Sequence, residues 1–238
     1  MSDVPPNSDL VSPTARVSLG TWPTPMEHAP RLAATLGLDD LWIKRDDLNG
    51  LGGGGNKIRK LEWTVAAALA DGADTLLTSG APQSNHARLT AAAGARLGLK
   101  VVVVMPGAPP ASPSGNLTLN GLFGASIAWA TDFADQCPPG PDEDGALAAV
   151  TELVAARLRD EGRRPALIPF GGSNAIGAHG YRLAAEEILE QVPDVAHVAV
   201  ALGSGGTMAG LVAGLGPGPV LGVHTAPSRI RTVSWPTC

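Results

Sequence analysis

The side chain whose position most suggests chemistry is Lys57, which follows the run Gly52-Gly53-Gly54-Gly55-Asn56. Glycines carry no side chain and tolerate positive φ, so the backbone here can approach a ligand closely. Asn56 is a favourable helix N-cap, and a helical pattern begins directly after it. An ammonium group near the positive end of a helix dipole has a lowered pKa, which favours the neutral amine. Lys57 is therefore a candidate for a lysine that forms a Schiff base.

Two other interpretations of this stretch stay open, because a glycine run before a lysine also suits a mobile loop or a phosphate grip. A P-loop is excluded, since it needs Ser or Thr after the lysine and Ile58 stands there. The choice of a catalytic amine is narrow because the chain has four lysines. Lys44 and Lys100 are expected at solvated strand ends, and Lys60 lies further along the same helix as Lys57.

A second polar turn, Gln83-Ser84-Asn85-His86, follows an apolar segment and opens a helix. Ser84 and Asn85 at a helix start fit simple capping. Alternatively, the Ser84 hydroxyl and nearby backbone N–H groups cradle an anion such as a substrate carboxylate. His86 by itself fits a structural role.

A third turn, Gly203-Ser204-Gly205-Gly206-Thr207, again joins a strand to a helix and is typical of a phosphate-binding site. It lacks the full dinucleotide pattern, and no acidic residue follows at the expected distance, so a monophosphate is favoured. The turn 171–174 is expected to form another wall of the same cleft, or else a structural turn. A lysine, an anion cradle and a monophosphate site on one side of a parallel sheet together indicate pyridoxal phosphate.

These turns need an alternating framework to position them, and the periodicity of the chain provides one. Strands and helices alternate from about residue 41 to residue 224, which predicts βαβ units, parallel sheet and an α/β fold. Ligands in such sheets lie beyond the carboxyl ends of the strands, where these turns fall. Helices are expected at 27–36, 59–70, 84–97, 116–122, 145–159, 175–191 and 207–215, and strands at 41–44, 74–79, 100–105, 126–130, 166–169, 195–202 and 220–224.

Composition narrows the classes of function. The 238 residues carry a net charge of −5 and are 44% apolar, with no basic block, so nucleic acid is not an expected partner. No signal peptide and no membrane-spanning run is apparent, and two cysteines provide no disulfide framework or metal site. A cytoplasmic protein without a membrane partner is expected.

The three turns, with Trp22-Pro23-Thr24-Pro25-Met26-Glu27 and Ile43-Lys44-Arg45-Asp46-Asp47, resemble the D-cysteine desulfhydrase and 1-aminocyclopropane-1-carboxylate deaminase group. These are fold-type-II, tryptophan-synthase-β-like enzymes that use pyridoxal 5′-phosphate. The resemblance covers roughly residues 16–224. A histidine at position 86 resembles the desulfhydrase branch, whereas the deaminase tends to carry glutamine there.

The resemblance implies a role for each candidate residue, with Lys57 and Ser84 as the catalytic residues. D-cysteine would displace Lys57 from the cofactor, and Lys57 would then take the Cα proton. Sulfide would leave from Cβ, and pyruvate and ammonia would follow by hydrolysis. The cofactor would be bound by Lys57, Asn56 and Asn85 and by Gly203, Ser204, Gly205, Gly206 and Thr207, and the small amino-acid substrate by Ser84, Asn85 and His86.

The resemblance further implies two three-layer α/β/α domains and a homodimer. A smaller domain, 60–165, would be inserted into a larger one formed by residues 16–59 and 166–227, between tails at 1–15 and 228–238. The family continues past residue 238, so a C-terminally truncated copy is expected. Truncation leaves open a non-catalytic remnant that still binds pyridoxal phosphate. Because residues 84–86 do not settle the substrate, a deaminase-type activity and an L-cysteate sulfo-lyase-type activity also remain as alternatives.

Overall fold

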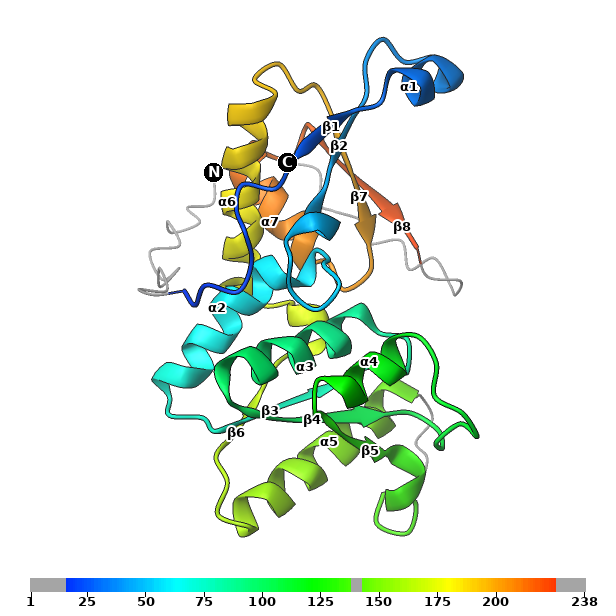
Figure 1. The fold of residues 1–238 in the computed structure, drawn as a ribbon, viewed down its shortest axis with the longest axis vertical. Coiled ribbons are helices and arrows are strands. Elements are labelled where there is room, and N and C mark those ends of the chain that lie inside the picture. Colours follow the sequence, from blue (N-terminus) through cyan, green and yellow to red (C-terminus); the bar gives the residue numbers. More distant parts are fainter. Residues whose placement is uncertain (1–15, 138–142, 226–238) are drawn as a thin grey trace, which may run out of the picture.

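The structure is a computed structural model that describes residues 16–137 and 143–225 (Figure 1). The two predicted tails, 1–15 and 228–238, lie outside these residues. The first part of the chain contains a strand pair and the helix that follows the glycine run. Its elements are β1 (Met26–His28), α1 (Pro30–Leu36), β2 (Trp42–Lys44), the 3₁₀ helix η1 (Asp46–Leu48) and α2 (Lys57–Ala70).

A four-stranded parallel sheet with the order β5-β4-β3-β6 forms the lower half of the molecule in Figure 1. Helices α3 and α4 lie on one face of the sheet and α5 on the other. The elements of this part are β3 (Thr75–Ser79), α3 (Asn85–Leu97), β4 (Lys100–Met105), α4 (Asn116–Leu122), β5 (Ser126–Trp129), η2 (Ala130–Phe133), α5 (Glu143–Asp160) and β6 (Pro165–Leu167).

Both faces of this sheet are covered by apolar packing, which follows from the alternation of side chains along a strand. Leu76 and Val103 pack with α2 and α3 in one core cluster. Their neighbours Leu77 and Val104 pack with α5 in another. All four side chains are fully buried, and each such burial contributes about 1.5–3 kcal/mol to folding. The ends of β3 and β4 are thereby held rigidly.

In the upper half of Figure 1, helices α6 (Ala175–Gln191) and α7 (Gly206–Leu215) lie beside the two-stranded sheets of the chain. Strands β7 and β8 pair in parallel, whereas β1 and β2 pair antiparallel. Glycine allows the helices to pack closely, since a Cβ on Gly210 would lie 2.3 Å from the carbonyl oxygen of Ala178. The elements here are η3 (Phe170–Gly172), α6 (Ala175–Gln191), β7 (Val198–Leu202), α7 (Gly206–Leu215) and β8 (Val220–His224).

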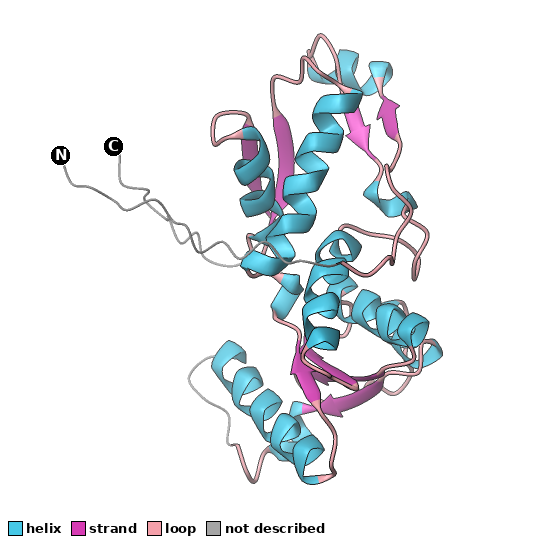
Figure 2. Ribbon diagram, turned by 90° about the vertical axis from the view of Figure 1, so that its left-hand side faces the viewer, coloured by secondary structure: helices cyan, strands magenta, loops and turns pink. Residues whose placement is uncertain are grey.

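Helix α2 lies between the two halves and contacts both (Figures 1 and 2). It approaches α6 closely because a Cβ on Gly180 would lie 2.0 Å from the carbonyl oxygen of Arg59. The buried Glu62 carboxylate also fastens the incoming chain, since its Oε1 accepts hydrogen bonds from the backbone N–H of Leu19 at 2.9 Å and the indole of Trp22 at 2.8 Å. The start of α2, with Lys57, is therefore fixed at the junction.

The predicted α/β class with mainly parallel pairing is confirmed, and some boundaries are corrected. The helix expected at 27–36 begins only at Pro30, because residues 26–28 pair with β2 as a strand. Residues 166 and 167 were assigned to the larger domain, but they pair with β3 in the four-stranded sheet. The division of the chain into two domains stays a prediction.

Candidate active site

A cleft of about 470 Å³ lies where α2 and α7 begin. Strand β7 and the middle of α6 contribute its other walls. Most of the predicted site residues meet in this cleft even though they come from three separate parts of the sequence. Those lining it are Asn56, Lys57, Asn85, Gly203, Ser204, Gly205 and Thr207.

Lys57 is the first residue of α2. Its Nζ donates a hydrogen bond to Oδ1 of Asn56 at 2.9 Å, and burial lowers the pKa of the lysine. We expected the helix dipole to lower this pKa, but in the structure the cause is desolvation by burial. Asn56 also differs from expectation, because its side chain does not cap α2. It instead donates from Nδ2 to Oγ1 of Thr207 at 3.2 Å and so joins the starts of the two helices.

The turn 203–207 presents an open helix start to the cleft. Gly205 has a left-handed φ of 83° and leads into α7, and no side chain caps that helix. The N–H groups of the first turn are therefore not used by a side-chain cap, and Ser204, Gly205 and Thr207 beside them line the cleft, which suits an anion. Gly206 is buried behind the turn, where a Cβ would lie 2.5 Å from Oγ of Ser173.

The turn 171–174 supports the turn 203–207 from behind. Oγ of Ser173 lies 2.6 Å from Oγ of Ser204, so the two hydroxyls share a hydrogen bond. None of residues 171–174 lines the cleft. The expectation that this turn forms a wall is therefore replaced by a supporting role one layer further out.

Lys60 is a functional candidate that the sequence interpretation passed over. Its side chain is 1% exposed, and its Nζ donates to Oγ of Ser173 at 3.3 Å. Burial first, and repulsion from Lys57 second, lower its pKa to about 7. Among the described residues no carboxylate forms an ion pair with it. The spacing i, i+3 from Lys57 on one helix face could have revealed it.

The glycine run is packed against protein and takes no part in lining the cleft. A Cβ on Gly54 would lie 1.7 Å from the carbonyl oxygen of Asp47, and one on Gly52 would lie 2.6 Å from Cβ of Ala92. The expectation that the run brings bare backbone to a ligand is therefore wrong. Glycine is needed here because the loop folds back on η1 and on α3.

Ser84 and His86 do not reach the cleft in this structure. Oγ of Ser84 accepts a hydrogen bond from the N–H of Ala87 at 3.2 Å and so caps α3. The His86 ring is 2% exposed, and its Nε2 lies 2.9 Å from Oγ1 of Thr78. Because Thr78 donates its single hydrogen to the carbonyl of Ile168, His86 must be the donor from Nε2. Burial lowers the pKa of His86 to about 3, so this ring is neutral.

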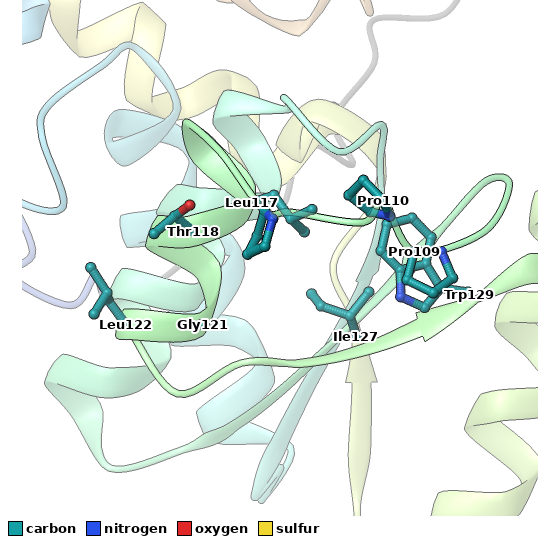
Figure 3. Close-up of a pocket in the computed structure, with 9 residues that line it drawn as sticks. Pro109, Pro110, Leu117, Thr118, Gly121, Leu122, Ile127 and Trp129 are labelled. Atoms are coloured by element: carbon teal, nitrogen blue, oxygen red, sulfur yellow. The ribbon is translucent and has the colours of Figure 1, made fainter.

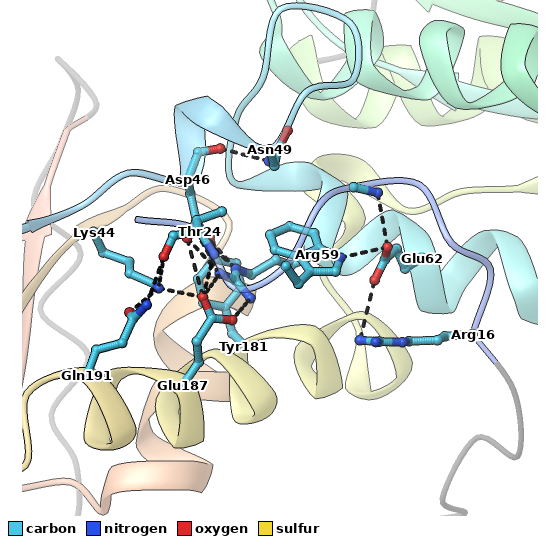
Figure 4. A network of polar contacts seen from close by, with 12 residues as sticks. Arg16, Thr24, Lys44, Asp46, Asn49, Arg59, Glu62, Tyr181, Glu187 and Gln191 are labelled. Carbon is cyan, nitrogen blue, oxygen red and sulfur yellow. Dashed lines mark hydrogen bonds and ion pairs between the residues drawn. The ribbon is translucent and has the colours of Figure 1, made fainter. Parts of the chain in front are cut away.

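Lys44, Asp46 and Tyr181 also line the cleft, although none was predicted as a site residue. Figure 4 shows that they belong to a polar network around Arg59, which bonds Oδ1 of Asp46 at 2.8 Å and Oε2 of Glu187 at 2.9 Å. Lys44 was expected in solvent, but it pairs with Glu187 and donates to Gln191. The Tyr181 hydroxyl donates to Oδ2 of Asp46 at 2.5 Å, and burial raises the pKa of this phenol. The network makes this wall of the cleft rigid.

A second cavity of about 420 Å³ lies beside α4 and β5 (Figure 3). Prolines, leucines, Ile127 and Trp129 dominate its walls, and none of the side chains lining it titrates. Of these two cavities, only the cleft at α2 and α7 is lined by titratable side chains.

Comparison with known proteins places this geometry in a family. A sequence profile of pyridoxal-phosphate dependent enzymes matches residues 17–235. The chain belongs to this family. It is 44% identical to a D-cysteine desulfhydrase of Salmonella typhi in an alignment of 209 residues that covers 84% of the chain and 60% of the relative. A D-cysteine desulfhydrase of Salmonella enteritidis matches with the same identity and coverage. The chain thus spans about 60% of the length of these relatives.

Solved structures agree with the fold expected for this family. A structure described as an ACC deaminase homologue superposes with a TM-score of 0.75 at 40% identity, covering 87% of this chain and 60% of the other. Maize serine racemase superposes with a TM-score of 0.62 at 22% identity, covering 84% and 55%, and supports the fold alone. The predicted fold type and the resemblance to the desulfhydrase and deaminase group are confirmed.

The residues of the cleft fit the family's cofactor, pyridoxal phosphate. Its aldehyde requires an amine that can be neutral, and burial lowers the pKa of Lys57. Its phosphate suits an uncapped helix start, which α7 provides, and Lys60 lines the same cleft. The described residues contain no metal-binding group of histidine, cysteine or carboxylate side chains, and no described helix is long and apolar enough to cross a membrane.

Proposed function

We propose that this chain carries the cofactor site of a carbon–sulfur lyase that converts D-cysteine and water into pyruvate, ammonia and sulfide. The single observation that carries the proposal is the convergence of Lys57, Asn85 and the turn 203–207 on one cleft. The identity of 44% to D-cysteine desulfhydrases supports the choice of substrate.

Each residue contributes through its own position. Lys57 would hold the cofactor covalently and, once released by the substrate, accept the Cα proton at Nζ. Burial favours the neutral amine that this proton transfer requires. When bound, pyridoxal phosphate supplies electron withdrawal that makes the Cα–H bond of an amino acid acidic. The first turn of α7, with Ser204 and Thr207, would hold the phosphate, and Asn85 would bind the ring oxygen of the cofactor.

The substrate carboxylate was expected at Ser84, Asn85 and His86, and the geometry favours only Asn85 for direct contact. Ser84 is occupied as the cap of α3, and His86 is buried against Thr78. We therefore propose that Ser84 and His86 act by fixing the start of α3.

The test is an absorbance spectrum of the purified protein with pyridoxal phosphate, followed by borohydride reduction and peptide mapping. We expect visible absorbance, a reduced label on Lys57, and release of sulfide and pyruvate from D-cysteine but not from L-cysteine. A label on Lys60 or Lys44 would overturn the assignment of Lys57. An absorbance change with D-cysteine but no sulfide would select a chain that binds the cofactor without turnover.

A deaminase-type activity is the second candidate, because the solved ACC deaminase homologue is 40% identical to this chain. It predicts release of ammonia and a four-carbon 2-oxo acid from 1-aminocyclopropane-1-carboxylate, without sulfide. An assay of both substrates on one preparation separates the two activities, and L-cysteate serves as a third substrate.

We further propose that the protein acts as a homodimer in the cytoplasm of a bacterial cell. The bacterial origin of the desulfhydrases to which it is similar supports the setting, and the family resemblance supports the dimer. Sedimentation equilibrium of the purified protein tests the dimer, and a single monomeric species would contradict it.

A further inference from the structure

Arg88, in the first turn of α3, is a buried cation whose side chain bonds the glycine loop before Lys57 and Asn85. Its side chain is 7% exposed, and among the described residues no carboxylate forms an ion pair with it. Its Nη1 donates to the carbonyl of Gly52 at 2.8 Å, and its Nη2 donates to the carbonyl of Gly54 at 2.9 Å. Nη2 also donates to Oδ1 of Asn85 at 3.3 Å. One guanidinium therefore joins the loop before Lys57 to the residue that faces the cleft.

The contacts of Arg88 with the loop are close enough to determine its shape. Gly53 has a φ of 83°, and a Cβ there would lie 2.7 Å from Nη1 of Arg88. A planar guanidinium can bond two carbonyls at once, which an ammonium on a flexible stem does not reproduce. Arg88 thus acts as a clamp on the segment that positions the start of α2.

The contacts of Asn85 fix which end of its amide faces the cleft. Arg88 has only donors, so the atom of Asn85 beside it must be the oxygen. Nδ2 of Asn116 donates to the same oxygen at 2.9 Å. This Asn116 atom must be the nitrogen, because it also donates to the carbonyl of Gln83 at 2.7 Å. Two donors therefore converge on Oδ1 of Asn85. Its Nδ2 is left as a donor at the wall of the cleft, with no hydrogen bond to any described residue.

We propose that Arg88 is a positioning residue that holds the loop 52–55 in place and turns the Asn85 NH₂ group toward the bound cofactor. The second role rests on the proposed function, because it needs a ligand acceptor in the cleft. The first role concerns the protein alone. The two roles can therefore be tested separately.

The test of the clamp measures amide hydrogen exchange of residues 50–56 in the protein without added cofactor. We expect Arg88→Met to raise the exchange rate of this segment at least about tenfold, the scale of a lost charge-assisted hydrogen bond. Arg88→Lys should rescue the segment only in part. Arg96→Met is the matched control, since Arg96 is an exposed arginine in the last turn of the same helix, and it should change nothing. Unchanged exchange in Arg88→Met would overturn the clamp.

The test of the second role measures the affinity for pyridoxal phosphate by absorbance titration. Asn85→Asp keeps an oxygen for Arg88 and Asn116 but removes the NH₂ donor, so we expect weaker binding by about tenfold with normal loop exchange. Arg88→Met should alter both readouts, and Arg96→Met neither. Full affinity in Asn85→Asp would overturn the orientation of Asn85. If the unaltered protein takes up no pyridoxal phosphate, the proposed function and this second role fail together, while loop exchange still decides the clamp.

Should Arg88→Met fail to fold, Arg88→Lys and Asn85→Asp carry the test. In that case the clamp is overturned if residues 50–56 exchange their amide hydrogens as slowly in Arg88→Lys as in the unaltered protein. Faster exchange in Arg88→Lys together with normal exchange in Asn85→Asp supports it.

Discussion

Two strand-to-helix turns in this chain look alike in sequence and differ in what their helix starts are free to bind. The turn before α3 is closed by Ser84, whose Oγ accepts the N–H of Ala87, and the next residue but one, His86, is buried. The turn before α7 has no side-chain cap, and Ser204, Gly205 and Thr207 line the cleft. An anion competes with a cap for the same N–H groups, so the uncapped turn is the one available to a phosphate.

The largest effect is expected at the start of α2, which shares the cleft with the uncapped turn. Lys57→Ala removes the amine that would bind the cofactor and accept the Cα proton, so sulfide release should fall by at least about 10²-fold. Borohydride should then leave no label at this site, and peptide mapping checks this. Activity retained in Lys57→Ala would show that another amine does the chemistry.

The uncapped turn should tolerate little change behind it. In Gly206→Ala the new Cβ would lie 2.5 Å from Oγ and 3.0 Å from Cα of Ser173, so the turn must shift. We expect a loss of about 1–3 kcal/mol in the free energy of unfolding and about tenfold weaker binding of pyridoxal phosphate. Urea denaturation and absorbance titration measure the two effects. Gly121→Ala on α4, where nothing lies within 4 Å of the added carbon, is the control.

Lys60 should make the uncapped turn sensitive to pH. Its pKa is about 7 in the folded protein and 10.5 as the ordinary value, so between these limits the unfolded chain binds more protons. The free energy of unfolding should therefore rise with pH from about 7 to 10.5 by the contribution of this group, and stay constant below that range. The affinity for pyridoxal phosphate should fall as the pH rises through this range, because the Lys60 ammonium loses its proton.

Urea denaturation at several pH values measures the free energy of unfolding of the unaltered protein and of Lys60→Met, which lacks the titrating amine. If the free energies of unfolding of the two proteins differ by the same amount at every pH from about 7 to 10.5, the lowered pKa of Lys60 is contradicted.

The smallest effect is expected at the capped turn. Ser84→Ala removes the N-cap of α3 and should lower the free energy of unfolding by about 1 kcal/mol. Ser84→Asp restores an acceptor and should recover this stability. If the substrate carboxylate bound at Ser84, the carboxylate introduced by Ser84→Asp would repel it. A raised KM for D-cysteine with recovered stability would therefore return Ser84 to the binding site.

Much of the site could be predicted from local sequence because its turns depend on local chemistry. The turn 203–207 follows from backbone freedom at a helix start, and Lys57 follows from its place at the start of the helix predicted after the glycine run. The purpose of the glycines could not be predicted, because it depends on Asp47, Ala92 and Arg88. Arg88 lies 34 residues after Gly54, the residue of the loop to which it bonds. Periodicity alone assigns Arg88 to a helix and does not indicate this contact.

The sequence by itself determined the alternating α/β framework, the type of turn at each strand end, and the candidate amine. These features arise from side-chain periodicity and from φ preferences that neighbours in the chain set. Tertiary structure decided the rest. It buried Lys60 and lowered its pKa, moved Lys44 from solvent into the network around Arg59, and turned Ser84 and His86 away from the cleft. Burial and hydrogen-bond partners come from segments far apart in the chain, such as Asn56 and Thr207, which are separated by 151 positions, and only the packed fold brings them together.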